Sequence, residues 1–179
     1  IVVALGGNNI IDGNSGNDNI QTGSGIDTLI GGEGNDTLDA GAGNDRLEGG
    51  VGSDVYIYKI GNGHDVISDY SAIATDMDSI SFGQGILIDA IELTRRDNDL
   101  TVTVDADNSI VIQNWFLEES YRVESFNFFD GSTLNVNEIE QRTIYYGDQN
   151  DNTMLGSKNG EQIFALDGND TVDGNLGDD

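Results

Sequence analysis

Large apolar residues recur at every ninth position over the first part of the chain, between stretches rich in Gly, Asn and Asp. From Ala4 the sequence divides into six contiguous blocks of nine, and a seventh follows a two-residue slip at Tyr58-Lys59. Within a block, six residues suit a tight turn, because Gly and Asn tolerate positive φ. The other three suit a short strand whose middle side chain points inward. That side chain occupies the eighth place: Ile11, Ile20, Leu29, Leu38, Leu47, Tyr56 and Ile67.

One turn and one strand make half a coil, so two blocks, or 18 residues, complete a circuit. Stacked circuits form two parallel sheets with the eighth-place side chains between them. A single block buries one such side chain, which does not offset an ordering cost of roughly 1–2 kcal/mol per residue. Neighbouring coils must therefore stack to make a core, and the pattern predicts an all-β solenoid.

Residues 71–143 contain few glycines and more than half of the aromatic residues of the chain. Alternating apolar positions predict a hairpin over 100–112 and a second one around Asp130-Gly131, followed by one short helix in VNEIEQRT. Because solenoid ends need capping, we expect this unit to be a small β-rich cap with Trp115 and Phe116 in its packing. The alternative is an exposed aromatic platform for a ligand.

The nine-residue frame returns at Gly147 with two degenerate blocks, and Gly168, Asp170 and Val172 restore it. The last block is cut after its sixth place, Asp179, which suggests that the natural protein continues. We therefore divide the chain into a repeat block at 1–69, a capping unit at 70–143 and the start of a second repeat block at 144–179.

The composition removes several classes of function. Acidic residues number 33 against 7 basic ones, giving a net charge of −26, which opposes phosphate contacts with nucleic acid. With no cysteine and one histidine, the chain lacks the residues for disulfides, zinc-thiolate sites or a multi-histidine metal site. No apolar run approaches the ~18 residues of a membrane helix. So acidic a chain is either disordered or neutralised by a cation.

The acidic residues recur at the sixth place of the blocks, a regular spacing that would suit ligands of a cation. The sixth place of a block is Asn9 in the first block and Asp in the six blocks that follow. Coiling brings each sixth-place residue beside the one 18 positions later in the sequence, for example Asp18 beside Asp36 and Asp36 beside Asp54. Carboxylates at that spacing repel unless a hard cation lies between them. Calcium fits, because it accepts 6–8 oxygen ligands in flexible geometry, whereas magnesium is stricter.

Residues 4–68 resemble the RTX (repeats-in-toxin) nonapeptide GGxGxDxUx. Residues 70–143 resemble the haemolysin-type calcium-binding-related domain in GNGHDVISDY, DSISFGQGI, IELTRRDNDLTVTV, IVIQNWF and VESFNFFDGSTLN. The resemblance implies a parallel β-roll with Ca²⁺ between its turns, disordered without calcium. It also implies type I secretion from a Gram-negative cell, with folding outside.

Carried over from the family, the ligands are sixth-place Asp side chains and turn carbonyls. The implied side-chain ligands are Asp18, Asp27, Asp36, Asp45, Asp54, Asp65 and Asp170. The implied carbonyl ligands, in the second and fourth places, are Gly23, Gly25, Gly32, Gly34, Gly41, Gly43, Gly50 and Gly52. Departures from the pattern weaken some positions: Asn9 replaces Asp, the slip disturbs an Asp45–Asp65 site, and Asn152 and Glu161 stand in sixth places of the second block.

Two further candidates receive local interpretations. His64 follows Gly63 in a turn and has no nucleophile elbow or HExxH motif to accompany it, so we expect a turn residue. Arg95-Arg96 is an isolated basic pair, which we interpret as a solvated turn edge, with an anion site as the alternative.

The favoured function is a non-enzymatic calcium-binding module of a secreted bacterial multidomain protein, such as a toxin, adhesin or exoenzyme. The expected partners are calcium ions, the type I secretion apparatus and, through other parts of the parent protein, a host-cell surface or membrane. One alternative is an adhesin segment that binds a receptor or sugar. Another is the non-catalytic tail of a secreted lipase or protease.

Overall fold

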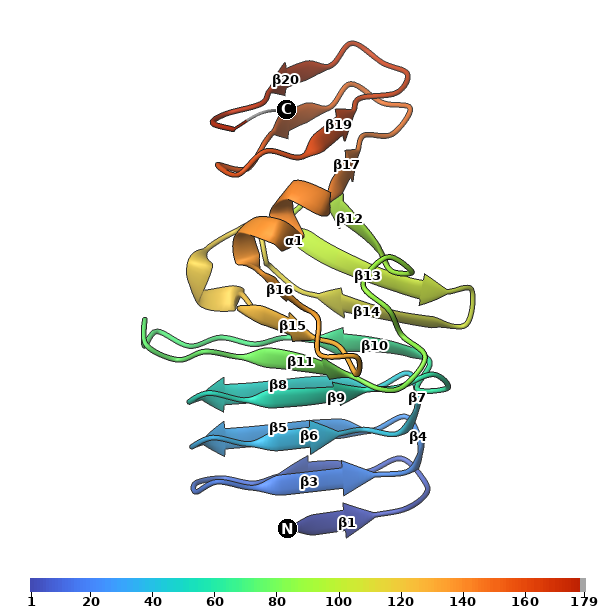
Figure 1. Cartoon of the computed structure of the whole chain (residues 1–179), viewed down its shortest axis with the longest axis vertical. Coiled ribbons are helices and arrows are strands. Elements are labelled where there is room, and N and C mark those ends of the chain that lie inside the picture. The colour runs from blue at the N-terminus through green and yellow to red at the C-terminus, as the bar shows by residue number, and fades with distance from the viewer. Residues whose placement is uncertain (178–179) are drawn as a thin grey trace.

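The computed structural model describes residues 1–177 of the 179-residue chain. Asp179, which the repeat frame puts in the sixth place of the last block, lies outside the described residues. The fold is all-β and consists largely of short parallel strands, as the repeat predicts. Figure 1 shows the strands stacked from the N-terminal end upward, with the α-helix above most of the strands and below β17, β19 and β20.

Two large sheets carry most of the strands. The first contains, in order across the sheet, β1 (Val2–Ala4), β3 (Asn19–Thr22), β6 (Thr37–Asp39), β9 (Val55–Tyr58), β11 (Ser79–Phe82), β15 (Ser125–Asn127) and β16 (Thr133–Asn135). The second contains β19 (Gln162–Phe164), β17 (Ile144–Tyr146), β12 (Glu92–Arg96), β13 (Asp99–Asp105), β14 (Asn108–Ile112), β10 (His64–Ile67), β8 (Arg46–Val51), β5 (Thr28–Glu33) and β2 (Ile10–Asp12). Two smaller pairs join β4 (Ser24–Gly25) to β7 (Ala42–Gly43) and β18 (Thr153–Leu155) to β20 (Thr171–Asp173).

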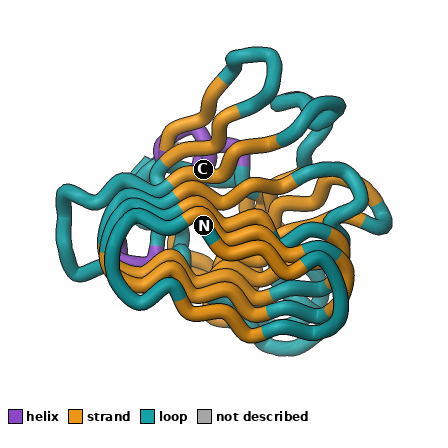
Figure 2. The backbone as a smooth tube through the Cα atoms, turned by 90° about the horizontal axis from the view of Figure 1, so that it is seen from below, coloured by secondary structure: helices purple, strands orange, loops and turns teal. Residues whose placement is uncertain are grey.

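The register confirms that two blocks make one coil. Ile20 lies opposite Leu38 in the first sheet, and Leu29 lies opposite Leu47 in the second, so each strand pairs with the one two blocks away. Viewed from the N-terminal end, successive coils lie nearly on top of one another (Figure 2). Turns of one coil are therefore stacked directly on the turns of the next.

The eighth-place side chains form the core between the sheets. Ile20, Leu29, Leu38, Leu47, Tyr56 and Ile67 are all buried. Ile11 in the first coil is only partly buried, and Ile1, Leu5 and Ile10 nearby are exposed. The first coil has a neighbour on one side only, which is why its apolar side chains stay accessible.

The two-residue slip is absorbed without breaking the stack. After it, Val66 pairs with Arg46, and Gly63 bridges to Gly43, so the offset between coils grows from 18 to 20 residues. Tyr58 of the slip is buried, and its hydroxyl donates to the carbonyl of Gly63 at 2.6 Å.

The middle unit extends both sheets of the roll. Strand β14 pairs with β10 in the second sheet, while β11 and β15 continue the first sheet after β9. The two predicted hairpins are confirmed as β13–β14 and β15–β16. The predicted helix is α1 (Val136–Arg142), whose N-terminus has a capping box between Asn135 and Glu138.

Aromatic side chains of the middle unit join the same hydrophobic core. Trp115 is fully buried and its ring centroid lies 6.1 Å from that of Phe126, which confirms the expected packing role. Phe116 is partly buried against this core. A 3₁₀ helix, η1 (Glu119–Tyr121), follows on the surface. The longest helix has seven residues, so within residues 1–177 no helix could cross a membrane.

One interpretation from the sequence is wrong. Arg95 is not a solvated turn edge, because alternation along β12 points its side chain inward, where it is 7% exposed. Its guanidinium lies 4.3 Å from the ring centroid of Phe116 and 4.2 Å from that of Tyr145, and it pairs with Glu161 at 3.2 Å. Aromatic faces and a carboxylate together compensate the buried charge. Arg96 is exposed, as expected.

The second repeat block continues the second sheet through β17 and β19, while β18 and β20 form a separate pair. Ile144 pairs with Gln162 and Thr153 with Thr171, which repeats the 18-residue register. Met154 is buried, but Val172 is 48% exposed. Each side of this block has only two stacked strands, β17 with β19 and β18 with β20, so its eighth-place side chains have few neighbours to cover them.

Candidate metal centre

The sixth-place residues are linked from coil to coil by one repeated hydrogen bond. In each case a sixth-place backbone N–H donates to Oδ1 of the sixth-place Asp on the next coil. The bonds run from Asn9 to Asp27 (2.7 Å), Asp18 to Asp36 (2.7 Å), Asp27 to Asp45 (2.8 Å), Asp36 to Asp54 (2.7 Å), Asp45 to Asp65 (3.0 Å) and Asn152 to Asp170 (2.9 Å). The turn geometry therefore fixes each carboxylate at the same point relative to its neighbours. In the first repeat block this gives two aspartate columns, one through Asp18, Asp36 and Asp54 and the other through Asp27, Asp45 and Asp65.

The second carboxylate oxygen in these columns has no donor. Oδ2 of Asp27, Asp36, Asp45 and Asp54 is buried and accepts no hydrogen bond from any described residue. A buried polar atom without a partner is costly, and more so when it carries charge. A repeated row of such oxygens is what a cation between the turns would satisfy.

The first-place glycines line the space beside these free oxygens. A Cβ on Gly31 would collide with Oδ2 of Asp36 and lie 2.6 Å from the carbonyl oxygen of Gly49. A Cβ on Gly13 would lie 2.9 Å from Oδ2 of Asp18 and 2.6 Å from the carbonyl oxygen of Gly31. A carboxylate oxygen and a carbonyl oxygen thus face the same small space, and calcium prefers such a set of oxygens.

First-place carbonyls were not among the ligands expected from the sequence. The signal was present, since Gly occupies the first place at Gly13, Gly31 and Gly49, in alternate blocks and therefore on one side of the roll. The carbonyl oxygen of a first-place glycine comes near a sixth-place carboxylate only when the coils are stacked. The nine-residue pattern alone therefore did not identify the first-place carbonyls as ligands.

The expected second- and fourth-place carbonyls also point along the stack. A Cβ on Gly41 would collide with the carbonyl oxygen of Gly23, and one on Gly50 with that of Gly32. The same relation holds from Gly25 to Gly43 and from Gly34 to Gly52. The carbonyl of Gly23 accepts a hydrogen bond from the N–H of Ala42 at 2.6 Å, which leaves one of its two lone pairs.

Burial disfavours the ionised form of four of the column carboxylates, those of Asp36, Asp45, Asp54 and Asp65. It raises the pKa of Asp45 to about 6 and that of Asp54 and Asp65 to about 7, against the opposing effect of the N–H each accepts. The pKa of Asp36 is raised for the same reason. Neighbouring carboxylates add to each shift by repulsion. A divalent ion between the turns would remove both the desolvation cost and the repulsion.

The departures from the repeat have visible consequences. Asn9 contributes no carboxylate, and its amide donates to Oδ1 of Asp27 at 3.1 Å and to the carbonyl of Gly7 at 2.7 Å. Asp65 stays in its column despite the slip and is buried. Glu161 pairs with Arg95 of β12, and its carboxylate also accepts the N–H of Ser157 within its own block at 2.8 Å.

Contrary to expectation, His64 is not a turn residue, because it is the first residue of strand β10 and pairs with Ser109 of β14. Its side chain is exposed, and Nδ1 lies 2.9 Å from Oγ of Ser109 on β14. Nothing in this contact resembles a nucleophile and base aligned for catalysis.

Comparison with known families agrees with this geometry. The RTX calcium-binding nonapeptide repeat matches residues 1–29, 21–56 and 146–179, and the haemolysin-type calcium binding protein related domain matches residues 99–138. The chain is also 34% identical over 127 residues to the iron-regulated protein FrpA of Neisseria meningitidis serogroup C. That match covers 69% of this chain and 10% of the length of FrpA.

Three observations therefore agree: the 18-residue register between coils, the columns of buried aspartates with unpaired oxygens, and the family match over half of the chain. RTX repeats bind Ca²⁺ and are typical of secreted bacterial proteins. The chain belongs to the RTX calcium-binding nonapeptide repeat proteins and carries a haemolysin-type calcium-binding-related domain between its two repeat blocks.

Proposed function

We propose that this chain is a non-enzymatic folding module of a secreted bacterial multidomain protein, and that calcium bound between its coils drives folding outside the cell. The observation that carries the proposal is the row of buried, unpaired Oδ2 atoms at Asp27, Asp36, Asp45 and Asp54. These oxygens destabilise a calcium-free roll and would stabilise a calcium-bound one.

The side-chain ligands in this proposal are the column aspartates, Asp18, Asp27, Asp36, Asp45, Asp54 and Asp65, with Asp170 in the second block. Turn carbonyls complete each site, from the second and fourth places and from the first-place glycines of the adjoining coil. The N–H bond to Oδ1 orients each carboxylate, so its remaining oxygen is presented to the ion in advance. Bound calcium supplies charge neutralisation and cross-links neighbouring turns.

The energetics favour a switch that depends on calcium concentration. Each site filled at about 100 times its Kd adds roughly 2.7 kcal/mol to the stability of the folded state. Inside a cell, where free calcium is scarce, a net charge of −26 keeps the chain extended and exportable. Outside, several sites filled together outweigh the ordering cost of the coils.

A role as a receptor- or sugar-binding segment receives less support. That role would use exposed aromatic side chains of the middle unit, but Trp115 is fully buried. A role as the tail of an exoenzyme is compatible with the module, with the catalytic activity on other parts of the parent protein. The chain spans about a tenth of the length of FrpA. In this proposal, the activity of the whole protein and its host-cell partners are assigned to other parts of the parent protein.

Circular dichroism with added calcium or magnesium tests the proposal. We expect a coil spectrum in EDTA, a β spectrum in millimolar calcium and little change in equal magnesium. A triple variant, Asp27→Asn, Asp36→Asn and Asp45→Asn, should fail to fold at the same calcium concentration. The control, Asp89→Asn, Asp97→Asn and Asp107→Asn, removes the same charge from exposed positions and should fold normally. A chain that is equally folded in EDTA contradicts the proposal.

A further inference from the structure

One aspartate column continues beyond the nonapeptide repeats. The N–H of Asp54, in the sixth block, donates to Oδ1 of Asp78 at 2.7 Å, just as Asp36 donates to Asp54. Asp78 belongs to no nine-residue block and lies directly before β11. The middle unit therefore supplies the carboxylate that the next coil of the roll would have supplied.

A third carboxylate joins this pair. Ligand oxygens of Asp54, Asp69 and Asp78 all lie within 4.8 Å of one another, and the three residues are 0%, 1% and 4% exposed. Oδ2 of Asp54 and Oδ2 of Asp69 are buried and accept no hydrogen bond from any described residue. This junction cluster thus adds the unpaired oxygen of Asp69 to that of Asp54, which also belongs to the column.

Backbone donors hold the junction cluster in place. Oδ1 of Asp69 accepts from the N–H of Gly50 at 3.2 Å, and the N–H of Asp78 donates to Oε2 of Glu124 at 2.7 Å. The loop between them is fixed by Asp76, whose Oδ2 accepts from the N–H of Gly52 at 3.0 Å and from Oγ of Ser71 at 2.5 Å. Each carboxylate of the cluster thus has Oδ1 on a backbone N–H, and its ligand oxygen lies within 4.8 Å of those of the other two.

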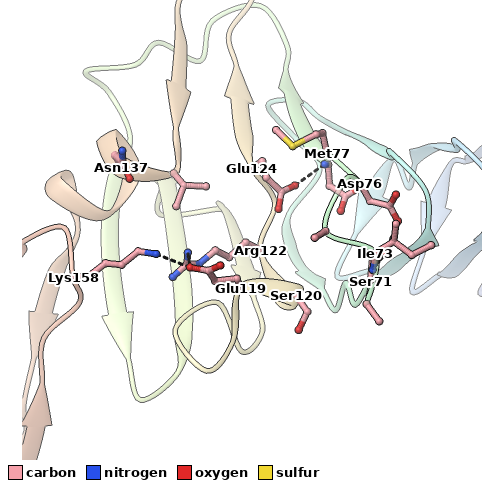
Figure 3. A pocket seen from close by; sticks show the side chains of 14 residues that line it. Ser71, Ile73, Asp76, Met77, Glu119, Ser120, Arg122, Glu124, Asn137 and Lys158 are labelled. Carbon is pink, nitrogen blue, oxygen red and sulfur yellow. Dashed lines mark hydrogen bonds and ion pairs between the residues drawn. The ribbon is translucent and has the colours of Figure 1, made fainter.

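No basic side chain of the described residues neutralises the junction cluster. Two basic residues, Arg122 and Lys158, line an adjoining cavity and are directed toward Glu119 (Figure 3). Arg122 pairs with Glu140 at 2.9 Å and with Glu119 at 3.6 Å, and Lys158 pairs with Glu119 at 2.5 Å. Burial raises the pKa of Asp78 to about 9, and repulsion from the charge of Asp69 adds to this shift.

We propose that Asp54, Asp69 and Asp78 hold a further calcium ion at the junction between the repeat block and the middle unit, in addition to the ions of the repeating columns. The site deepens the proposed function and rests on it. Three carboxylates suit calcium, which takes 6–8 oxygens from mono- or bidentate carboxylates and water. The adjoining cavity of about 390 Å³ is lined by Asp76, Asp78 and Glu124 and gives the ion and its water ligands a route in.

The position of the ion gives it a distinct role. Asp69 follows β10 in the second sheet, and Asp78 precedes β11 in the first, so the ion would close the loop that carries the chain from one sheet to the other. Filling this site would order the first part of the middle unit on the finished end of the roll. Calcium binding in the repeats and folding of the middle unit would then be coupled.

Calorimetric titration of calcium into the full chain tests the site. We expect Asp69→Asn to bind one calcium ion fewer than the unaltered protein. Asp99→Asn is the matched control, because its carboxylate also accepts a backbone N–H, from Asn114 at 2.8 Å, but lies outside the junction cluster. It should bind the full number. An unaltered number of ions in Asp69→Asn overturns the junction site and leaves the proposed function standing, whereas a parent chain that binds no calcium overturns both.

A second measurement decides the matter if Asp69→Asn fails to fold. Crystals of the unaltered protein grown with terbium should show an anomalous peak about 2.3–2.6 Å from carboxylate oxygens of Asp69 and Asp78, the distance range of calcium-like ligation. A crystal with peaks in the regular columns and none at these residues overturns the inference.

Discussion

The N–H of Asp36 donates to Oδ1 of Asp54 at 2.7 Å, and Oδ2 of Asp54 is left buried without a donor. The two oxygens of the Asp54 carboxylate therefore make different interactions. The first fixes the register between coils, and the second is available to a cation. Because every coil repeats this division, a residue in the middle of a column influences two neighbouring turns, while a residue at its end influences one.

The first prediction compares two positions in one column. Asp36→Ala removes the acceptor of the Asp18 N–H and a carboxylate that lies between two turns, whereas Asp18 is at the beginning of its column and is half-buried. We expect Asp36→Ala to be the more destabilising in calcium, by about the value of one additional site, roughly 2.7 kcal/mol at 100 times Kd. Chemical unfolding in calcium measures the difference, and equal effects would refute the stacked-site arrangement.

The second prediction concerns the first-place glycines. In Gly31→Ala the new methyl would meet Oδ2 of Asp36 and the carbonyl of Gly49, both of which are proposed to face the ion. Overpacking of this kind costs about 1–3 kcal/mol, and calcium affinity should fall as well. Gly6→Ala is the control, since its nearest neighbour would be Oγ of Ser24 at 3.9 Å. Calcium midpoints by circular dichroism that match in the two variants would show that the space beside Asp36 is not a ligand site.

The repeat register could be predicted from the sequence because it depends on local chemistry. Gly at the fourth place and an apolar residue at the eighth place, as in Gly34 and Leu38, fix a turn and an inward side chain within one block. The 18-residue offset then follows from geometry. The partners of the aspartates in the columns could be named in advance for this reason.

Features that depend on distant segments could not be predicted. Arg95 is buried by Phe116, Tyr145 and Glu161, the last of which is 66 residues away, and nothing near Arg95 in sequence shows this. Asp69 and Asp78 lie in a loop without repeat pattern, and their meeting with Asp54 depends on how the chain crosses between the sheets. A charged residue on the inward face of β12 was the one available signal for Arg95.

The third prediction follows from the burial of Arg95. Arg95→Met leaves the buried carboxylate of Glu161 without its guanidinium partner, and breaking a buried ion pair from one side costs about 3–5 kcal/mol. We expect a loss of thermal stability in calcium of that order, beginning in the second repeat block. Arg96→Met is the matched control, because this neighbouring side chain is exposed and its replacement should change stability by no more than about 0.5 kcal/mol. Similar melting curves for the two variants would contradict the burial of Arg95.

The last prediction is the pH dependence of the calcium-free chain. Burial raises the pKa of Asp45 to about 6 and that of Asp54 and Asp65 to about 7 in the folded roll, from an ordinary value of 3.8. The folded state therefore binds more protons than the unfolded state between these limits, and its stability falls as the pH rises. In EDTA, the β content should be greatest near the ordinary pKa of Asp and should be lost as the pH rises through about 6 to 7.

Calcium should reverse this dependence, because the ion and the protons compete for the same carboxylates. With calcium present, β structure should increase over the pH range in which the calcium-free chain loses it. Circular dichroism from acid to neutral pH, with EDTA or calcium, checks both curves. Asp45→Asn with Asp65→Asn should flatten the EDTA curve, whereas Asp89→Asn with Asp107→Asn removes the same charge from exposed positions and should leave it steep. An EDTA curve that rises with pH would mean that the column carboxylates are already compensated without metal.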